Sequence, residues 1–167
     1  MRIPLLVTIA LAIVVCLPAC AQVNQQAIDD VKAGKLKEAK ASWWGFDATD
    51  ATACLQAAIN SGVPKLTVDE VGKPWIVNPI TLVSNQEITF EKGVEVVARK
   101  GGFLGTNDCL FSAVNVENVV LRGYGATWRM HRDDYANPPY KKAEWRHSLQ
   151  IKSSRNIQVL GLHLLES

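Results

Sequence analysis

The sequence predicts a mainly β protein: a right-handed parallel β-helix, a solenoid that begins with short N-terminal capping helices and is truncated after about three coils. Two observations predict this fold. Short β-rich runs follow one another from Lys65 onward, each bounded by Gly, Pro or Asn. A polar turn that leads into an alternating strand also recurs along the chain at unequal spacings. Unequal spacing is typical of solenoid coils that carry side loops of different length.

Residues 1–21 have the pattern of a signal peptide. Met1-Arg2 carries one positive charge, an apolar run extends from Ile3 to Leu17, and small residues follow it. The apolar run is shorter than the roughly 20 residues that a membrane-spanning helix needs. We therefore expect a protein without a membrane span that is exported to the medium, the periplasm or the cell envelope. Cleavage after Ala21 is favoured, and the alternative is a lipoprotein anchored through an acylated Cys20.

Residues 22–46 are expected to form a helical lead-in. Apolar residues alternate with Asp, Lys and Glu at helical spacing between Val23 and Ala41, and Gly34 interrupts the pattern. The aromatic segment at residues 43–46 is more typical of a core plug than of a ligand platform.

A second helix opens the domain that we expect to span residues 47–167. Asp47 or Asp50 can cap its first turn, and the segment 60–62 ends it. Its buried face is expected to carry Leu55, Ala58 and Ile59. The helix is short and amphipathic, as a capping helix should be.

The β-rich part of the chain repeats a unit made of a polar turn and a strand. This unit aligns Ile88 with Val119 and Val119 with Ile157. Residues 131–144 lack a strand period and contain two prolines, which predicts a projecting loop. In solenoids such insertions gather on one face, often the binding face. Further strands are expected at residues 66–68, 75–77, 80–83, 87–90 and 94–98.

The net charge bears on whether the protein binds nucleic acid, and the cysteine content bears on whether it contains disulfide bonds. A formal net charge of +2 argues against a nucleic-acid partner bound by bulk charge. Outside the signal peptide only Cys54 and Cys109 remain, and two cysteines are not a disulfide framework. An oxidising compartment permits a bond between them, and two buried thiols acting as small apolar side chains are the favoured alternative.

Two stretches resemble known proteins. Residues 47–62, with their Asp/Thr-rich turn and the segment Leu55-Gln56-Ala57-Ala58-Ile59, resemble the opening of pectate-lyase-superfamily β-helix proteins. Residues 145–167 look like a coil of polygalacturonase-like proteins with right-handed β-helix repeats. The resemblance implies a substrate cleft floored by residues 148–151. The aspartate motifs that carry catalysis in polygalacturonases are absent here, so the resemblance assigns no catalytic residue.

The function implied by the resemblance is action on polysaccharide outside the cell. The full-length parent is expected to be a glycosidase or polysaccharide lyase acting on acidic glycans, while this segment lacks the catalytic coils. The alternative is a non-catalytic carbohydrate-binding or cell-surface β-helix protein, such as an adhesin. No cofactor is expected for the segment itself, although Ca²⁺ would suit a full-length parent.

The first candidate binding cluster is Trp145-Arg146-His147. Trp145 can stack on a sugar face, Arg146 can pair with a uronate carboxylate, and His147 can move a proton near neutral pH. The structural alternative is an arginine bonded to loop carbonyls beside a tryptophan that covers the edge of the coil.

The second set of candidates lies on the 131–144 loop. Tyr135 and Tyr140 could form a sugar platform, or could simply stiffen a proline-containing loop. Asp133 and Asp134, with Glu144 at the far end, could ligate Ca²⁺ or act as an acid pair, but a solvated acidic loop is favoured. Lys141-Lys142 could attract an acidic polysaccharide. No spacing of His, Cys or Asp predicts a zinc site.

Overall fold

The computed structural model describes residues 23–143 and 145–167. The expected signal peptide, the candidate lipidation site Cys20 and the loop acid Glu144 lie outside the described residues. Within the described residues, no helix is long and apolar enough to cross a membrane.

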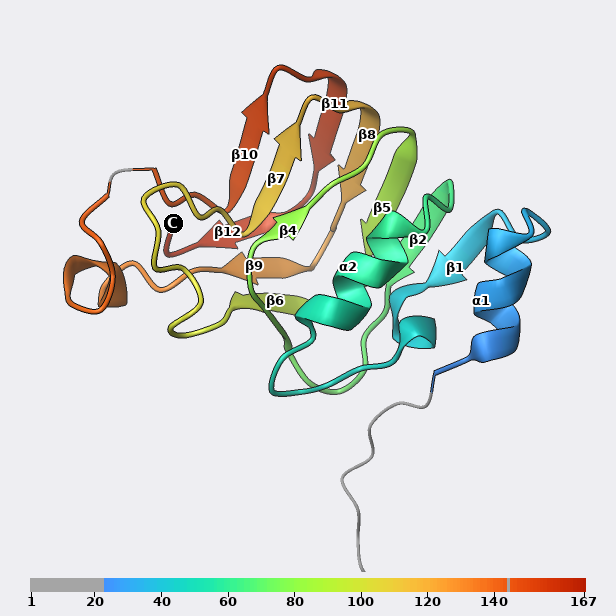
Figure 1. Cartoon of the computed structure of the whole chain (residues 1–167), viewed down its shortest axis with the longest axis horizontal. Coiled ribbons are helices and arrows are strands. Elements are labelled where there is room, and N and C mark those ends of the chain that lie inside the picture. The colour runs from blue at the N-terminus through green and yellow to red at the C-terminus, as the bar shows by residue number, and fades with distance from the viewer. Residues whose placement is uncertain (1–22, 144) are drawn as a thin grey trace, which may run out of the picture.

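The protein is mainly β and is built from three parallel sheets (Figure 1). One sheet has the strand order β1-β2-β5-β8-β11, the second β10-β7-β4 and the third β12-β9-β6-β3. The strands are β1 (Glu38–Lys40), β2 (Lys65–Val68), β3 (Trp75–Val77), β4 (Ile80–Thr81), β5 (Gln86–Phe90), β6 (Glu95–Ala98), β7 (Phe111–Val114), β8 (Glu117–Arg122), β9 (Thr127–Arg129), β10 (Leu149–Lys152), β11 (Arg155–Leu160) and β12 (His163–Leu165).

Consecutive strands belong to different sheets. From β2 onward the chain visits the five-stranded, four-stranded and three-stranded sheets in turn, and then returns to the first. Apart from the pair of β1 and β2, strands therefore pair in parallel with the strand one circuit away rather than with their neighbour in sequence. The predicted β-rich runs are confirmed as strands, although β4 is only two residues long.

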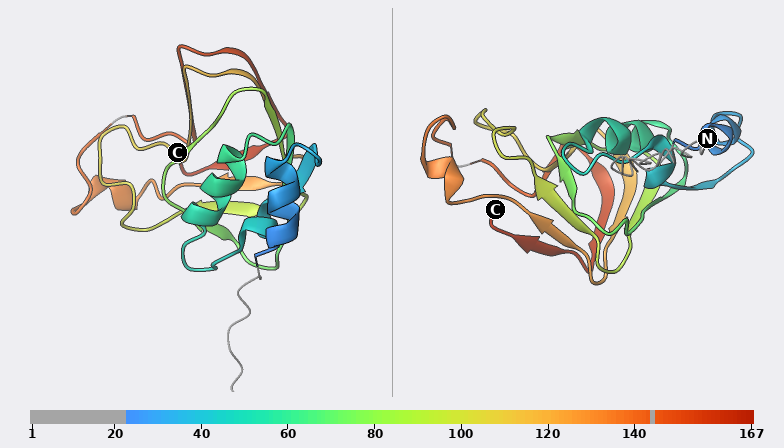
Figure 2. Two further views of the ribbon diagram at one scale, coloured as in Figure 1. Left: turned by 45° about the vertical axis from the view of Figure 1, so that its right-hand side comes forward. Right: turned by 90° about the horizontal axis from the view of Figure 1, so that it is seen from below.

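The three sheets face one another around a common interior (Figure 2). Buried and partly buried residues alternate along the strands, so every second side chain contributes to the core in this interior. Phe90, Phe111 and Trp128 come from one sheet each and meet in this space. The Phe111 and Trp128 rings stack with centroids 4.1 Å apart, and Phe90 packs edge-on to Trp128 at 5.1 Å. All three side chains are buried, so this aromatic cluster ties the sheets together.

The capping helix is confirmed as α2 (Thr52–Asn60), with the predicted buried face of Leu55, Ala58 and Ile59. Its N-cap position is Ala51 rather than an aspartate. Asp50 instead stands one residue earlier, where its Oδ1 accepts hydrogen bonds from the backbone N–H and the hydroxyl of Thr52, the N–H at 3.0 Å. The aspartate thus satisfies the first free N–H of the helix from outside it.

Helix α2 is joined to the edge of β4 by one side chain. The Gln56 amide donates to the Thr81 carbonyl and accepts from the Thr81 N–H, both at 2.9 Å. A glutamine on the helix therefore takes the hydrogen-bonding place of a further strand and protects this edge of the sheet.

The lead-in is only partly helical. Helix α1 (Gln25–Lys32) ends before Gly34, which has a positive φ of 70°. Residues 38–40 are strand β1, and Ala39 is buried opposite Leu66 of β2. The helix expected up to Ala41 is therefore wrong, because parallel pairing with β2 outweighs a weak helical pattern. A short 3₁₀ helix, η1 (Ala41–Trp44), follows, and Phe46 packs edge-on to the buried Trp75 at 4.9 Å.

The register of the repeats is set by a row of asparagines. The Asn118 amide donates to Asn85, and the Asn156 amide donates to Asn118, each at 2.8 Å. All three asparagines have positive φ. Ile88 consequently pairs with Leu121 and not with Val119 as the sequence alignment predicts, whereas Val119 does pair with Ile157. The error is two residues, so inward-facing positions stay inward.

Cys54 and Cys109 are free thiols, Cys109 buried and Cys54 half-buried. Burial raises the pKa of both above its ordinary value of 9.0. They act as small apolar side chains, the alternative that the sequence favours over a disulfide.

Candidate functional site

Two loops project from the same side of the molecule (Figure 1). One joins β6 to β7 (residues 99–110) and the other joins β9 to β10 (residues 130–148), which contains the predicted insertion. The Lys141 N–H donates to the Leu104 carbonyl at 3.2 Å, and the Gly101 N–H donates to the Tyr140 hydroxyl at 2.8 Å. The loops therefore form one unit although they belong to successive circuits of the chain.

Arg146 is the residue that clamps this unit. Its side chain is buried, with Nε donating to the Phe103 carbonyl at 2.9 Å and Nη2 donating to the Lys141 carbonyl. Its guanidinium carbon lies 5.1 Å from the centre of the Tyr135 ring and 5.8 Å from that of Tyr140. The structural alternative for Arg146, an arginine bonded to loop carbonyls, is thus present.

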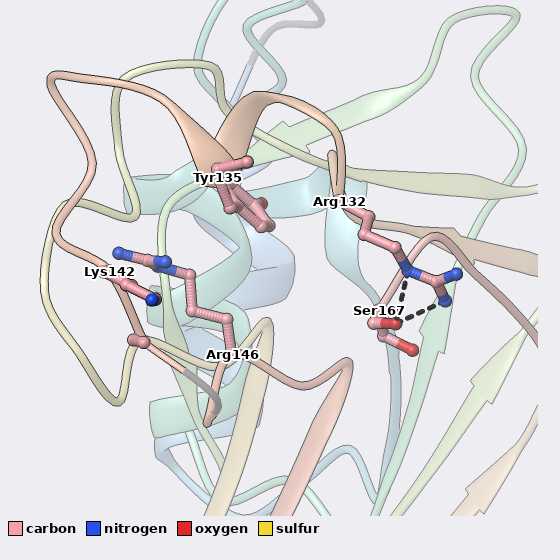
Figure 3. A pocket seen from close by; sticks show the side chains of 7 residues that line it. Arg132, Tyr135, Lys142, Arg146 and Ser167 are labelled. Carbon is pink, nitrogen blue, oxygen red and sulfur yellow. Dashed lines mark hydrogen bonds between the residues drawn. The ribbon is translucent and has the colours of Figure 1, made fainter.

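A pocket of about 330 Å³ opens between the clamp and the end of β12 (Figure 3). The basic side chains of Arg132, Lys142 and Arg146 line this pocket. The Arg132 guanidinium also donates to the Ser167 carbonyl oxygen, at 2.6 Å from Nη2. No salt bridge within residues 23–143 and 145–167 engages Lys142 or Arg146, whereas the nearby Asp134 is paired with Lys100 at 3.1 Å. The lining consists of Arg132, Tyr135, Ala136, Lys142, Ala143, Arg146 and Ser167.

Two polar groups of the pocket lining are buried without a hydrogen-bond partner among the described residues. They are Nη1 of Arg146 and the hydroxyl of Tyr135. Burial raises the pKa of Tyr135 to about 12, so its hydroxyl stays protonated and able to donate at any physiological pH. Neither atom is exposed to the open space of the pocket, where the exposed side chains of Arg132 and Lys142 supply positive charge.

Trp145 and His147 face away from this pocket. The chain alternates here, with Trp145 and His147 exposed and Arg146 and Ser148 buried. The two exposed rings contact each other edge-on, with centroids 6.1 Å apart. Cys109 Sγ lies 3.4 Å from the Trp145 carbonyl, and the Leu110 N–H donates to the His147 carbonyl at 3.0 Å. The predicted trio is therefore split between two faces of one segment.

The remaining loop candidates have local roles. The Tyr135 and Tyr140 rings pack edge-on, with centroids 5.1 Å apart, beneath the Arg146 guanidinium. Asp133 is exposed, and Asp134 is held by Lys100. No group of three His, Cys, Asp or Glu among the described residues is arranged to hold a metal ion.

The strand expected to floor a cleft lies in the three-stranded parallel sheet as β10. Its Leu149 and Ile151 continue the inward-facing rows of Phe111 and Ala113. Gln150 pairs in register with Ser112, which in turn pairs with Thr81, so a short polar row lies on the outer face.

Sequence reasoning missed Arg132 and the contribution of the 99–110 loop. Gly101 and Gly102 look like turn residues in the sequence, and nothing local shows that the carbonyl of Phe103 receives Arg146. Only the circuit-to-circuit packing brings these segments together.

No protein-family model, no curated protein and no solved structure matches this chain.

Proposed function

We propose that this chain is an exported right-handed parallel β-helix protein that binds acidic polysaccharide. The rotation of successive strands through three parallel sheets supports this fold. The binding site is the pocket between Arg146 and Ser167, and the group that it takes is the carboxylate of a uronic acid.

The observation that carries the proposal is the positive charge that lines one pocket. Arg132 and Lys142 are exposed in its lining, and the buried Arg146 adds a third positive charge. Guanidinium and ammonium groups donate hydrogen bonds, and a carboxylate has two oxygens that accept them. Charge-assisted bonds of this kind are about twice as strong as neutral ones.

Binding suits the pocket better than bond cleavage. Glycoside hydrolysis generally uses two carboxyl groups that flank the scissile bond. The described lining residues carry bases and a phenol but no Asp or Glu side chain. We therefore propose binding rather than cleavage at this pocket, and an adhesin-like function fits the same observation.

Tyr135→Phe is a control for the packing of the loop. It removes a hydroxyl that is not exposed to the pocket and keeps the ring that packs against Tyr140 and Arg146. We expect the affinity for trigalacturonate, measured by calorimetry, to change by less than about twofold. The free energy of unfolding should stay unchanged or rise, because the lost hydroxyl has no partner among the described residues.

Two neighbouring lysines provide a matched pair of variants. Lys142 lines the pocket, whereas Lys141 does not. Lys142→Gln should weaken binding of trigalacturonate by about fivefold to tenfold, and Lys141→Gln should leave it nearly unchanged. The methyl ester of the same oligosaccharide should bind weakly to every variant. Equal binding of acid and ester, or equal effects of the two lysines, would refute the proposal.

A further inference from the structure

One basic group of the pocket lined by Arg132, Lys142 and Arg146, here called the basic pocket, is already engaged by the chain itself. Arg132 Nε and Nη2 both donate to the carbonyl oxygen of Ser167, at 3.1 and 2.6 Å, and Ser167 is part of the pocket lining (Figure 3). Two neighbouring N–H groups of a guanidinium are also the donors that bind a carboxylate through parallel hydrogen bonds. The Ser167 carbonyl therefore competes for the donors that an acidic ligand would use.

We propose that the bond between Arg132 and Ser167 is an autoinhibitory contact, which must break before an acidic ligand can engage all three basic groups. The proposal rests on the proposed function of the basic pocket, and it adds a competition between the ligand and residues 166–167. The protein then has a closed state with this contact and an open state without it. Because the ligand selects the open state, its apparent affinity falls in proportion to the population of the closed state.

The backbone beside Ser167 is held in an unfavourable conformation. Glu166 has a φ of 56°, in the left-handed region that a glutamate seldom adopts. The other described residues with positive φ are glycines, asparagines and one serine, which are either free of a Cβ or short enough to bond to nearby backbone. Release of Ser167 lets Glu166 return to an extended conformation, so the closed state carries a backbone cost that opening removes.

Two contacts hold residues 166–167 in the closed state. Arg129 Nη1 donates to the Glu166 carboxylate at 2.6 Å, and the Met130 N–H donates to the Leu165 carbonyl at 3.0 Å. The second contact fixes the end of β12, so the movement can be confined to Glu166 and Ser167. The first joins two side chains that are 34% and 46% exposed, and an ion pair this open to water is easily broken. A local rearrangement of two residues is therefore enough to open the contact.

Arg129 has two carboxylate partners, which provide a matched pair of variants. Its Nη1 donates to Glu166, and its Nε donates to Glu95 at 2.9 Å. Glu166→Gln weakens the hold on Ser167, so we expect the affinity for trigalacturonate, measured by calorimetry, to rise about twofold to fivefold. Glu95→Gln removes the same charge from the same arginine but leaves residues 166–167 held, and it should not raise the affinity. The comparison separates release of the contact from a simple gain in positive charge.

A second pair of variants tests the contribution of the backbone. Glu166→Ala and Glu166→Gly both remove the ion pair with Arg129. Glycine adopts a φ of 56° without steric cost, whereas alanine does not, so the glycine variant keeps more of the closed state. Glu166→Ala should therefore bind trigalacturonate more tightly than Glu166→Gly. Equal affinities would show that the conformation of residue 166 does not oppose the contact.

Arg132→Gln completes the test, because it removes the donor for which Ser167 and the ligand compete. It should weaken binding, and Glu166→Gln should have no further effect in this background. If Glu166→Gln and Glu95→Gln act alike in the wild-type background, the autoinhibitory contact is refuted, while the effect of Lys142→Gln still supports the basic pocket. If neither wild-type nor Glu166→Gln protein binds trigalacturonate, the proposed function fails and the contact fails with it. Unchanged thermal unfolding would show that the variants are folded.

Discussion

Single asparagine residues help to set the register between strands, which the alternation of apolar and polar residues does not determine. Asn85, Asn118 and Asn156 occupy a left-handed backbone conformation that few side chains tolerate. Asparagine is one of those few, and its amide both donates and accepts. The row of amides therefore links successive circuits and holds them in one register.

The middle asparagine should be the most sensitive of the row. Asn118→Ala removes two amide hydrogen bonds and places a Cβ-bearing residue without local hydrogen bonding at a φ of 57°. We expect urea denaturation to show a loss of about 2–3 kcal/mol in the free energy of unfolding. Asn118→Gly keeps the conformation accessible and should lose about 1 kcal/mol less. Equal losses for the two variants would mean that backbone conformation contributes nothing here.

The contacts of the Arg146 side chain depend on segments that are distant from it in the sequence. The sequence places it in a suggestive trio, but the backbone alternation turns its side chain away from Trp145 and His147. Its hydrogen-bond acceptors come from Phe103 and Lys141, on two different loops. The sequence singles out Arg146 as a candidate, but no local pattern indicates which segments its side chain contacts.

At the scale of elements, helix α2 was predictable because the residues that determine it lie close together in the sequence. The buried face, the preceding aspartate and the terminating Gly62 all lie within a dozen positions or so of one another. Strand β1 was not predictable in the same way. Its three residues become a strand only because β2 offers an edge, and β2 lies on the far side of η1 and α2 in the sequence.

The start of α2 should make stability depend on pH. The hydrogen bond from the Thr52 hydroxyl lowers the pKa of Asp50 below its ordinary value of 3.8, with the Thr52 N–H and the positive charge of Arg99 acting in the same direction. A lowered folded-state pKa stabilises the protein above the unfolded value, and this stabilisation disappears as the pH falls through the folded value.

Comparison with Asp50→Asn isolates this effect. The variant should be less stable than wild type at neutral pH, since asparagine accepts less strongly from Thr52 and does not attract Arg99. The difference in free energy of unfolding should shrink as the pH falls from about 6 toward 3. A difference that stays constant over this range would exclude a role for the charge of Asp50. Denaturant titrations at a series of pH values would measure it.

At the scale of the whole molecule, stability rests on side chains that meet from different sheets. Phe90, Phe111 and Trp128 lie on β5, β7 and β9, and no two of them are close in sequence. Their contact closes the interior between the sheets. The loops on the same side of this closed body are joined by the hydrogen bonds of Lys141 to Leu104 and of Gly101 to Tyr140.

Trp128 is therefore the position where the core should be most vulnerable. Trp128→Ala is expected to lower the free energy of unfolding by about 3–5 kcal/mol, because the cavity cannot close between rigid sheets. Trp128→Phe should cost clearly less, since it retains an aromatic ring and removes a buried Nε1 that has no partner among the described residues. Chemical denaturation with near-UV circular dichroism would test both. A phenylalanine variant as unstable as the alanine variant would contradict the proposed stacking role.

The sequence by itself determined that the protein is mainly β, where most strands lie, which side chains point inward, and that a loop interrupts the last repeats. These properties follow from patterns that repeat every two to four residues. Such patterns can be recognised in a short stretch of sequence without knowledge of the tertiary structure. Tertiary structure decided the pairing of Ile88 with Leu121, the strand at residues 38–40, the direction of Arg146 and the pocket that it lines with Arg132. Each of these depends on a partner one circuit of the chain away, and the free energy of that contact exceeds the local preference.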